Sequence, residues 1–112
     1  MNNETQIVKG ILEGCIIKIM ERGEMYGYKT VELLNQYGFE VNEATVYPIL
    51  TRLQNKGILE TEQRPSPLGP ARKYYSLTEE GKKSLKEFQE IWLRIQYIVN
   101  YVMEGDKNDE KR

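Results

Sequence analysis

The chain has 112 residues, enough for one domain with a small core and too few for a second domain of ordinary size. Its 16 Lys and Arg nearly balance its 17 Asp and Glu, so any binding to nucleic acid must depend on where the charges lie. The chain has no histidine and one cysteine, which excludes an internal disulfide and a structural zinc site. We therefore expect no enzyme activity and no cofactor.

The N-terminal part of the chain is predicted to be an amphipathic helix. Apolar residues recur at intervals of three and four over positions 4–22. Lys18 and Glu21 interrupt this apolar run, so neither a signal peptide nor a membrane-spanning segment is predicted. We expect a cytoplasmic protein that does not contact a membrane.

Two further helices are predicted in the next part of the chain. The second helix ends near Gly38, and Asn42 is well suited to cap a third helix over positions 43–56. Pro48 lies five residues past the start of that helix and cannot donate a backbone hydrogen bond. We therefore expect an irregular or kinked first turn. Gly57 supplies the left-handed residue that commonly ends a helix.

A β-hairpin is predicted directly after the third helix. Positions 58–64 and 72–77 are short, bounded segments that favour strands. Positions 65–71 hold three of the four prolines, which predicts a stiff loop whose edges do not pair. A helix followed by a two-stranded ribbon is typical of the recognition half of a winged helix-turn-helix.

The last helix is predicted to begin at Thr78, whose hydroxyl can cap it. Its apolar residues follow a heptad seam, which indicates packing within the subunit or in a dimer: Leu85, Phe88, Trp92, Ile95, Val99 and Val102. The predicted fold is mainly α with a small β-hairpin. It divides into a winged helix-turn-helix DNA-binding domain (1–77), a C-terminal dimerisation helix (78–104) and a polar, disordered tail (105–112).

Charge is unevenly distributed along the chain. Positions 42–77 carry five Lys or Arg and three Glu, a local charge of +2, so the remainder carries −3 of the total of −1. Such a segment can bind DNA phosphates through counterion release, and a helix can enter the major groove. The alternative is that these charges form an ordinary solvated face.

Three strings carry a resemblance to a known family. The string GPARKYYSLTEEG at 69–81 resembles the wing motif of the PadR family of bacterial transcriptional regulators. The string VNEATVYPILTRLQNKGIL at 41–59 resembles its recognition helix, and YGYKTVELL at 26–34 its second helix. With the first and last helices, the resemblance covers nearly the whole chain, and the motifs are highly specific in combination.

The resemblance implies a homodimeric winged-helix repressor whose last helix exchanges contacts with the partner subunit. It also implies which residues lie near DNA or on the wing: Lys29, Thr45, Tyr47, Arg52, Gly69, Arg72 and Lys73. Ala71 departs from the larger or basic residue that the family often carries at this position, which makes the wing less basic.

A possible effector site lies on the last helix. In some family members a tryptophan on this helix lines a hydrophobic cavity at the dimer centre, and Trp92 falls at the matching position. Its flat face suits a planar aromatic ligand, and two-fold symmetry would bring two such faces together. Phe88, Ile95 and Val99 could wall a site for a small hydrophobic or aromatic effector. The alternative is that Trp92 only packs in the core or dimer interface.

Two functions from different classes fit the sequence. The first is a dimeric repressor that reads a pseudo-palindromic operator in double-stranded DNA with two recognition helices about 34 Å apart. The second is a winged-helix protein-interaction module that does not bind DNA. An enzyme is the third and weakest reading, because the sequence lacks a histidine, a phosphate-binding glycine loop and a nucleophile elbow.

Overall fold

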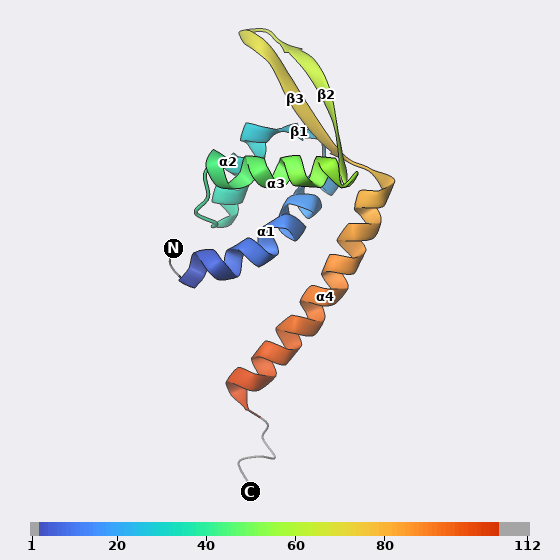
Figure 1. The fold of residues 1–112 in the computed structure, drawn as a ribbon. Helices are drawn as coiled ribbons and strands as arrows, with labels where there is room; N and C mark the ends of the chain where they lie inside the picture. Colours follow the sequence, from blue (N-terminus) through green and yellow to red (C-terminus); the bar gives the residue numbers. More distant parts are fainter. Residues whose placement is uncertain (1–2, 106–112) are drawn as a thin grey trace, which may run out of the picture.

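The computed structural model describes residues 3–105, so the tail predicted at 105–112 lies outside the described residues except for Gly105. The predicted fold class is confirmed: helices dominate, and the strands form one small antiparallel sheet (Figure 1). In chain order the elements are α1 (Asn3–Arg22), β1 (Met25–Tyr26), α2 (Gly27–Tyr37), α3 (Glu43–Asn55), β2 (Leu59–Ser66), β3 (Gly69–Leu77) and α4 (Glu79–Glu104).

Helices α1, α2 and α3 enclose the core together with the base of the sheet. Each contributes an apolar stripe, and the side chains that are almost fully buried include Leu12, Ile16, Leu34, Leu50 and Leu53. The single cysteine packs against this cluster and is half-buried. Since the inner stripe of α3 faces the core, its opposite face is exposed to solvent.

The predicted ends of α3 are confirmed. The Oδ1 of Asn42 accepts a hydrogen bond from the backbone N–H of Thr45 at 3.1 Å, which satisfies one of the free donors of the first turn. Gly57 follows the helix with a φ of 77°, a left-handed conformation that favours glycine. Pro48 does not interrupt α3, so the irregular first turn is not observed. The proline leaves the carbonyl of Ala44 without its helical donor, and Ala44 lies on the exposed face.

The hairpin is longer than the sequence predicted, because its strands extend through most of the proline-rich segment at 65–71. The strands pair as far as Ser66 and Gly69, and the register shifts between Arg64 and Ser66. Pro65 occupies that irregularity, where a strand does not need every backbone donor. The hairpin therefore projects well beyond the helices as a wing (Figure 1).

A third strand, β1, was not predicted. Its two residues pair with the base of the wing, Met25 opposite Tyr75 and Tyr26 opposite Tyr74, which makes β3 the central strand. Two residues are too few to show an alternating pattern, so the sequence gives no signal for this strand. The pairing ties the start of α2 to the wing.

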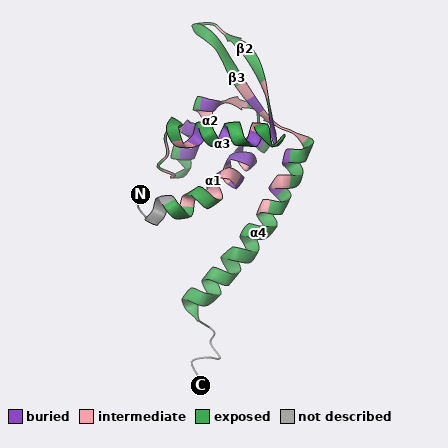
Figure 2. Ribbon diagram, viewed as in Figure 1, coloured by how far each residue is buried: buried purple, intermediate pink, exposed green. Residues whose placement is uncertain are grey.

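Helix α4 begins tightly against the end of α3 and the sheet. The Thr78 hydroxyl accepts from the N–H of Gly81 at 3.0 Å, which confirms the predicted cap, and donates to the carbonyl of Gly57 at 2.6 Å. Its N-terminal part packs on α1, where a Cβ on Gly14 would lie 2.3 Å from the ring of Phe88. From 89 to 104 every residue is exposed, so the rest of α4 extends away from the domain without cover (Figure 2).

Candidate nucleic-acid interface

The exposed face of α3 lies beside the wing and the start of α2. Tyr47 and Thr51 are exposed on this face, and Thr45 is half-buried near the N-terminus of the helix. The Thr45 hydroxyl donates to Asn42 at 3.3 Å, which holds it at the capped end. The structure therefore presents Tyr47 and Thr51 together on the exposed face of the helix that the sequence identified as the recognition helix. Thr45 lies two residues before Tyr47, about 200° around the helix, and so points to the opposite flank.

A hollow of about 600 Å³, here called the α2 hollow, lies between α3, the first turn of α2 and the wing. Its walls include four tyrosines and two cations but no carboxylate: Tyr26, Gly27, Tyr28, Tyr47, Thr51, Arg72, Lys73 and Tyr75. Three of the residues predicted to lie near DNA, Tyr47, Arg72 and Lys73, thus meet at one site. The ring of Tyr47 lies so close to Gly27 that a Cβ there would be 3.1 Å from it.

Stacked aromatic and guanidinium groups stiffen the base of the wing. The Arg72 guanidinium lies 4.5 Å from the centre of the Tyr26 ring, and that ring meets Tyr74 edge-on at 5.8 Å. Arg64 covers Tyr74 at 4.6 Å and pairs with Glu24 at 2.8 Å. The hydrogen bond from Arg64 lowers the pKa of the Glu24 carboxyl. These contacts join β1 to both long strands.

Carboxylates neutralise several of the cations in and around the predicted interface. Glu13 of α1 pairs with Arg52 at 2.6 Å and with Lys56 at 3.6 Å, and Lys29 pairs with Glu32 at 3.0 Å. Two of the predicted DNA-contacting cations, Lys29 and Arg52, are therefore engaged within the protein.

Arg72 and Lys73 differ from these cations, because neither forms an ion pair with any residue that the structure describes. Both are exposed. Gly69, the remaining wing residue, opens β3 opposite Ser66 at the exposed tip. Among the described residues, Arg72 and Lys73 are thus the unpaired cations of the surface formed by α3 and the wing, and the tip of the wing is uncharged.

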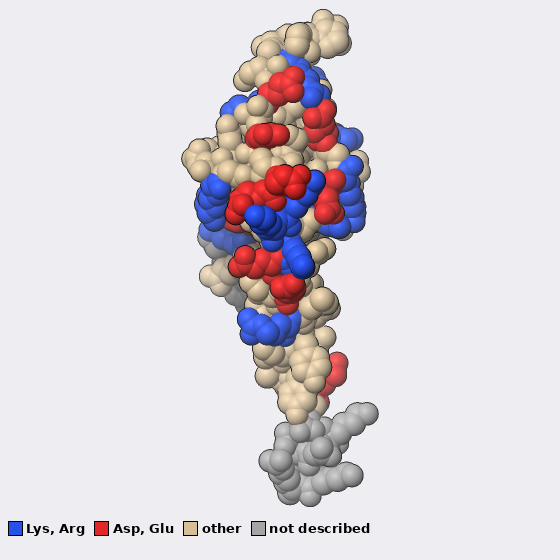
Figure 3. Space-filling view, turned by 90° about the vertical axis from the view of Figure 1, so that its right-hand side faces the viewer, with Lys and Arg blue, Asp and Glu red and all other residues tan. Residues whose placement is uncertain are grey.

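The predicted effector residues are only partly brought together. Phe88 is half-buried against α1, whereas Trp92, Ile95 and Val99 are 40%, 42% and 45% exposed farther along α4. Within one protomer they form an open apolar stripe rather than an enclosed site. A view onto the α4 side shows interspersed charges on the body of the molecule and few charges on the far part of α4 (Figure 3).

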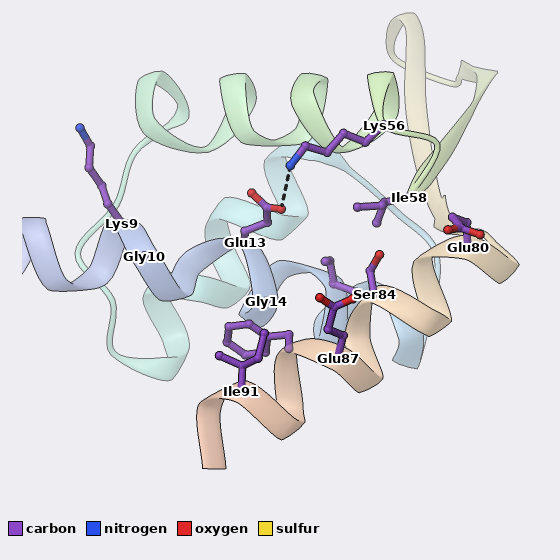
Figure 4. A pocket seen from close by; sticks show the side chains of 12 residues that line it. Lys9, Gly10, Glu13, Gly14, Lys56, Ile58, Glu80, Ser84, Glu87 and Ile91 are labelled. Carbon is purple, nitrogen blue, oxygen red and sulfur yellow. Dashed lines mark ion pairs between the residues drawn. The ribbon is translucent and has the colours of Figure 1, made fainter. Parts of the chain in front are cut away.

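A second hollow, of about 620 Å³, lies between α1, α4 and the end of α3 (Figure 4). We call it the α1–α4 hollow. It includes Phe88 but none of the other three predicted effector residues. Glu13 reaches across it from α1 to Lys56, and Glu87 and Ile91 face it from α4 (Figure 4).

Comparisons with known proteins identify the family. A family model described as the transcriptional regulator PadR-like family matches residues 16–87. The chain belongs to this family. The match includes α2, α3, the wing and the start of α4, the elements that form the surface described above. This chain is accordingly a PadR-like DNA-binding transcriptional regulator.

Individual relatives agree with the family assignment. A PadR-like transcriptional regulator from Bacillus cereus, whose crystal structure is known, is 41% identical in sequence to this chain. The two structures superpose with a TM-score of 0.80, and the match covers 90% of this chain and 99% of that one. An uncharacterised protein of Lysinibacillus sphaericus is 32% identical over 90% of this chain and 95% of its own length. A transcriptional regulator of Mycobacterium tuberculosis is 38% identical over 57% of this chain and 59% of its own.

Three residues of the interface escaped the sequence analysis. Glu13 gave no signal, because its partners on α3 and at the C-cap of that helix are about forty positions away and only the packed fold brings them together. Tyr26 and Tyr75 belong to the β1–β3 pairing, which was not predicted.

None of the described helices is both long enough and apolar enough to span a bilayer.

Proposed function

We propose that the protein is a homodimeric, sequence-specific repressor, and that α3 and the wing read double-stranded DNA. The observation that carries this proposal is the placement of Arg72 and Lys73. They lack carboxylate partners among the described residues and lie in one hollow with Tyr47 and Thr51 of α3. Arg72 and Lys73 would contact phosphates on any sequence, whereas Thr45 and Tyr47 would contribute to base preference. In this proposal the protein acts in the cytoplasm and by binding alone, without catalysis.

Dimerisation through α4 is the second part of the proposal. The uncovered stripe on α4 consists of large apolar side chains that are 39% to 68% exposed: Ile91, Trp92, Ile95, Ile98, Val99 and Val102. Apolar surface that stays in contact with water does not stabilise a monomer, and a patch of this kind usually marks an interaction site. Their heptad spacing suits packing against a second copy of the same helix. The chain would then divide into a DNA-binding unit at 1–77 and a dimerisation helix at 78–104, and two-fold symmetry would match a pseudo-palindromic operator.

Relief of repression by a small hydrophobic or aromatic ligand is the third part. Trp92 would offer a flat face near the two-fold axis, with Phe88, Ile95 and Val99 around it. A ligand that changed the angle between the two copies of α4 would act directly on the DNA-reading elements. Thr78 joins them, because its hydroxyl caps α4 and donates to the carbonyl of Gly57, which ends α3.

The experiment is a titration of duplex affinity against salt, read by fluorescence anisotropy. The proposal predicts that the affinity of the wild type falls steeply as the salt concentration rises. For Arg72→Ala/Lys73→Ala it predicts a shallower slope in the plot of log affinity against log salt concentration. The matched control is Lys82→Ala/Lys83→Ala, which removes the same amount of positive charge from α4 instead of the wing. This control should give the same salt slope as the wild type.

A flat slope for the wild type would refute DNA reading through this face. Binding to a protein partner that survives high salt would instead support the protein-interaction alternative. That alternative has one observation in its favour, since Glu13 neutralises Arg52 on α3 and Lys56 at the C-cap of that helix.

A further inference from the structure

The hydroxyl of Tyr75 has no hydrogen-bond partner in the part of the chain that the structure describes. Tyr75 lies in β3, is 8% exposed and forms part of the core cluster, yet no hydrogen bond joins its hydroxyl to any described residue. The hydroxyl is not sealed inside the core, because among the described residues only the Thr30 hydroxyl is both fully enclosed and without a hydrogen-bond partner. The polar end of Tyr75 therefore opens into the α2 hollow, which its side chain lines.

The first turn of α2 borders the same hollow and offers further donors. The N-cap residue, Tyr26, makes no side-chain cap, and the first turn of this 11-residue helix has no acidic residue. Backbone N–H groups at such a helix start lack helical partners and carry partial positive charge. Gly27 brings this backbone against the ring of Tyr47, so the Tyr47 hydroxyl lies at the helix start.

The side chains that line the hollow include hydrogen-bond donors but no carboxylate, although the charge of Glu43 on α3 acts on the nearby Tyr47 hydroxyl. Arg72 and Lys73 supply charged N–H donors, and no Asp or Glu lines the hollow. Burial raises the pKa of both the Tyr47 and Tyr75 hydroxyls, so both keep their protons at neutral pH. A ligand that fits this site is an anion with several acceptor oxygens.

We propose that the α2 hollow binds a single phosphate group, and that this group is one phosphodiester of the operator backbone in each half-site. The inference rests on the proposed DNA binding and deepens it. Helix starts and mixed Arg, Lys and Tyr donors are common partners of phosphate oxygens. A phosphate held between α2, α3 and β3 would fix the depth and register of α3 in the groove. The Tyr75 hydroxyl would donate to this phosphate, and the packing of its ring in the core would hold the hydroxyl in place.

The test combines duplexes that carry one uncharged methylphosphonate at successive positions with the variant Tyr75→Phe. For the wild type, one position per half-site should reduce affinity about tenfold, the size expected for a lost hydrogen bond to a charged group. Tyr75→Phe should bind the unmodified duplex about tenfold more weakly. A methylphosphonate at that position should then reduce its affinity much less than it reduces the affinity of the wild type.

Tyr74→Phe is the matched control, because Tyr74 precedes Tyr75 in β3 but does not line the hollow. It should keep the wild-type profile. The thermal midpoint of Tyr75→Phe should equal that of the wild type, since the hydroxyl that it removes has no partner within the described protein. Wild-type affinity with an unchanged methylphosphonate profile in Tyr75→Phe would overturn the inference.

A second measurement distinguishes the source of the phosphate. Inorganic phosphate is titrated at constant ionic strength without DNA, while the amide signals of Gly27 and Tyr28 are followed by NMR. Saturable shifts that Tyr75→Phe abolishes would support a site that also accepts free phosphate. A methylphosphonate effect without such shifts would assign the site to DNA alone. If no duplex binds, the proposed function fails, and the absence of phosphate shifts as well would then overturn the inference.

Discussion

Replacing Gly14 by alanine should loosen the attachment of α4 to α1. The added Cβ would lie 2.3 to 2.4 Å from three carbons of the Phe88 ring, far inside the normal separation of about 3.5 to 4.0 Å. The ring must therefore move by more than about 1 Å or change rotamer. Overpacking of this kind costs about 1 to 3 kcal/mol, and alanine recovers about 1 kcal/mol of helix propensity. The expected net loss is about 1 kcal/mol of unfolding free energy.

Gly10→Ala on the same helix is the matched control. Apart from the backbone of α1 itself and the chain neighbours of Gly10, no atom of the described residues lies within 4 Å of a Cβ built there, so this variant gains helix propensity of up to about 1 kcal/mol without a clash. Urea unfolding of both variants at one protein concentration measures the difference, since a dimer's midpoint depends on concentration. The contact between Gly14 and Phe88 would be refuted if Gly14→Ala were as stable as Gly10→Ala.

Three further predictions concern DNA binding. Arg72→Ala/Lys73→Ala should reduce the log–log salt slope by up to about 1.8 per protomer, from about 0.9 per lost phosphate contact, and a salt titration that gave the wild-type slope would contradict this. Thr45→Ala should change the preferred sequence in a competition assay more than it changes affinity for random duplex, and an equal loss on all duplexes would contradict its role. Glu13→Gln should release Arg52 and strengthen binding to any duplex, so unchanged affinity would show that this cation does not reach DNA.

The capping and glycine signals predicted most of the fold. Asn42, Gly57 and Thr78 set the ends of α3 and the start of α4, because each acts through backbone groups within three residues. Such short-range physics is visible in sequence. The heptad spacing on α4 likewise predicted an apolar stripe, which the structure shows uncovered beyond Phe88.

Long-range contacts were the part that the sequence could not supply. The pairing of β1 with β3 and the Glu13–Arg52 ion pair both depend on where packing places distant segments. The extended wing was missed because proline was read as a barrier to pairing, although Pro65 sits at an irregularity in the ladder. For the candidate site, the sequence identified Arg72 and Lys73 but not the buried tyrosine beside them.

The central claim is that a symmetric pair of these chains reads DNA through α3. Selection of bound duplexes from a random-sequence pool, followed by sequencing, tests it most directly. The account predicts an enriched pseudo-palindrome whose half-site centres are about 34 Å apart, or about one helical turn. A pool without enrichment, or one enriched in a single unrepeated half-site, would contradict it.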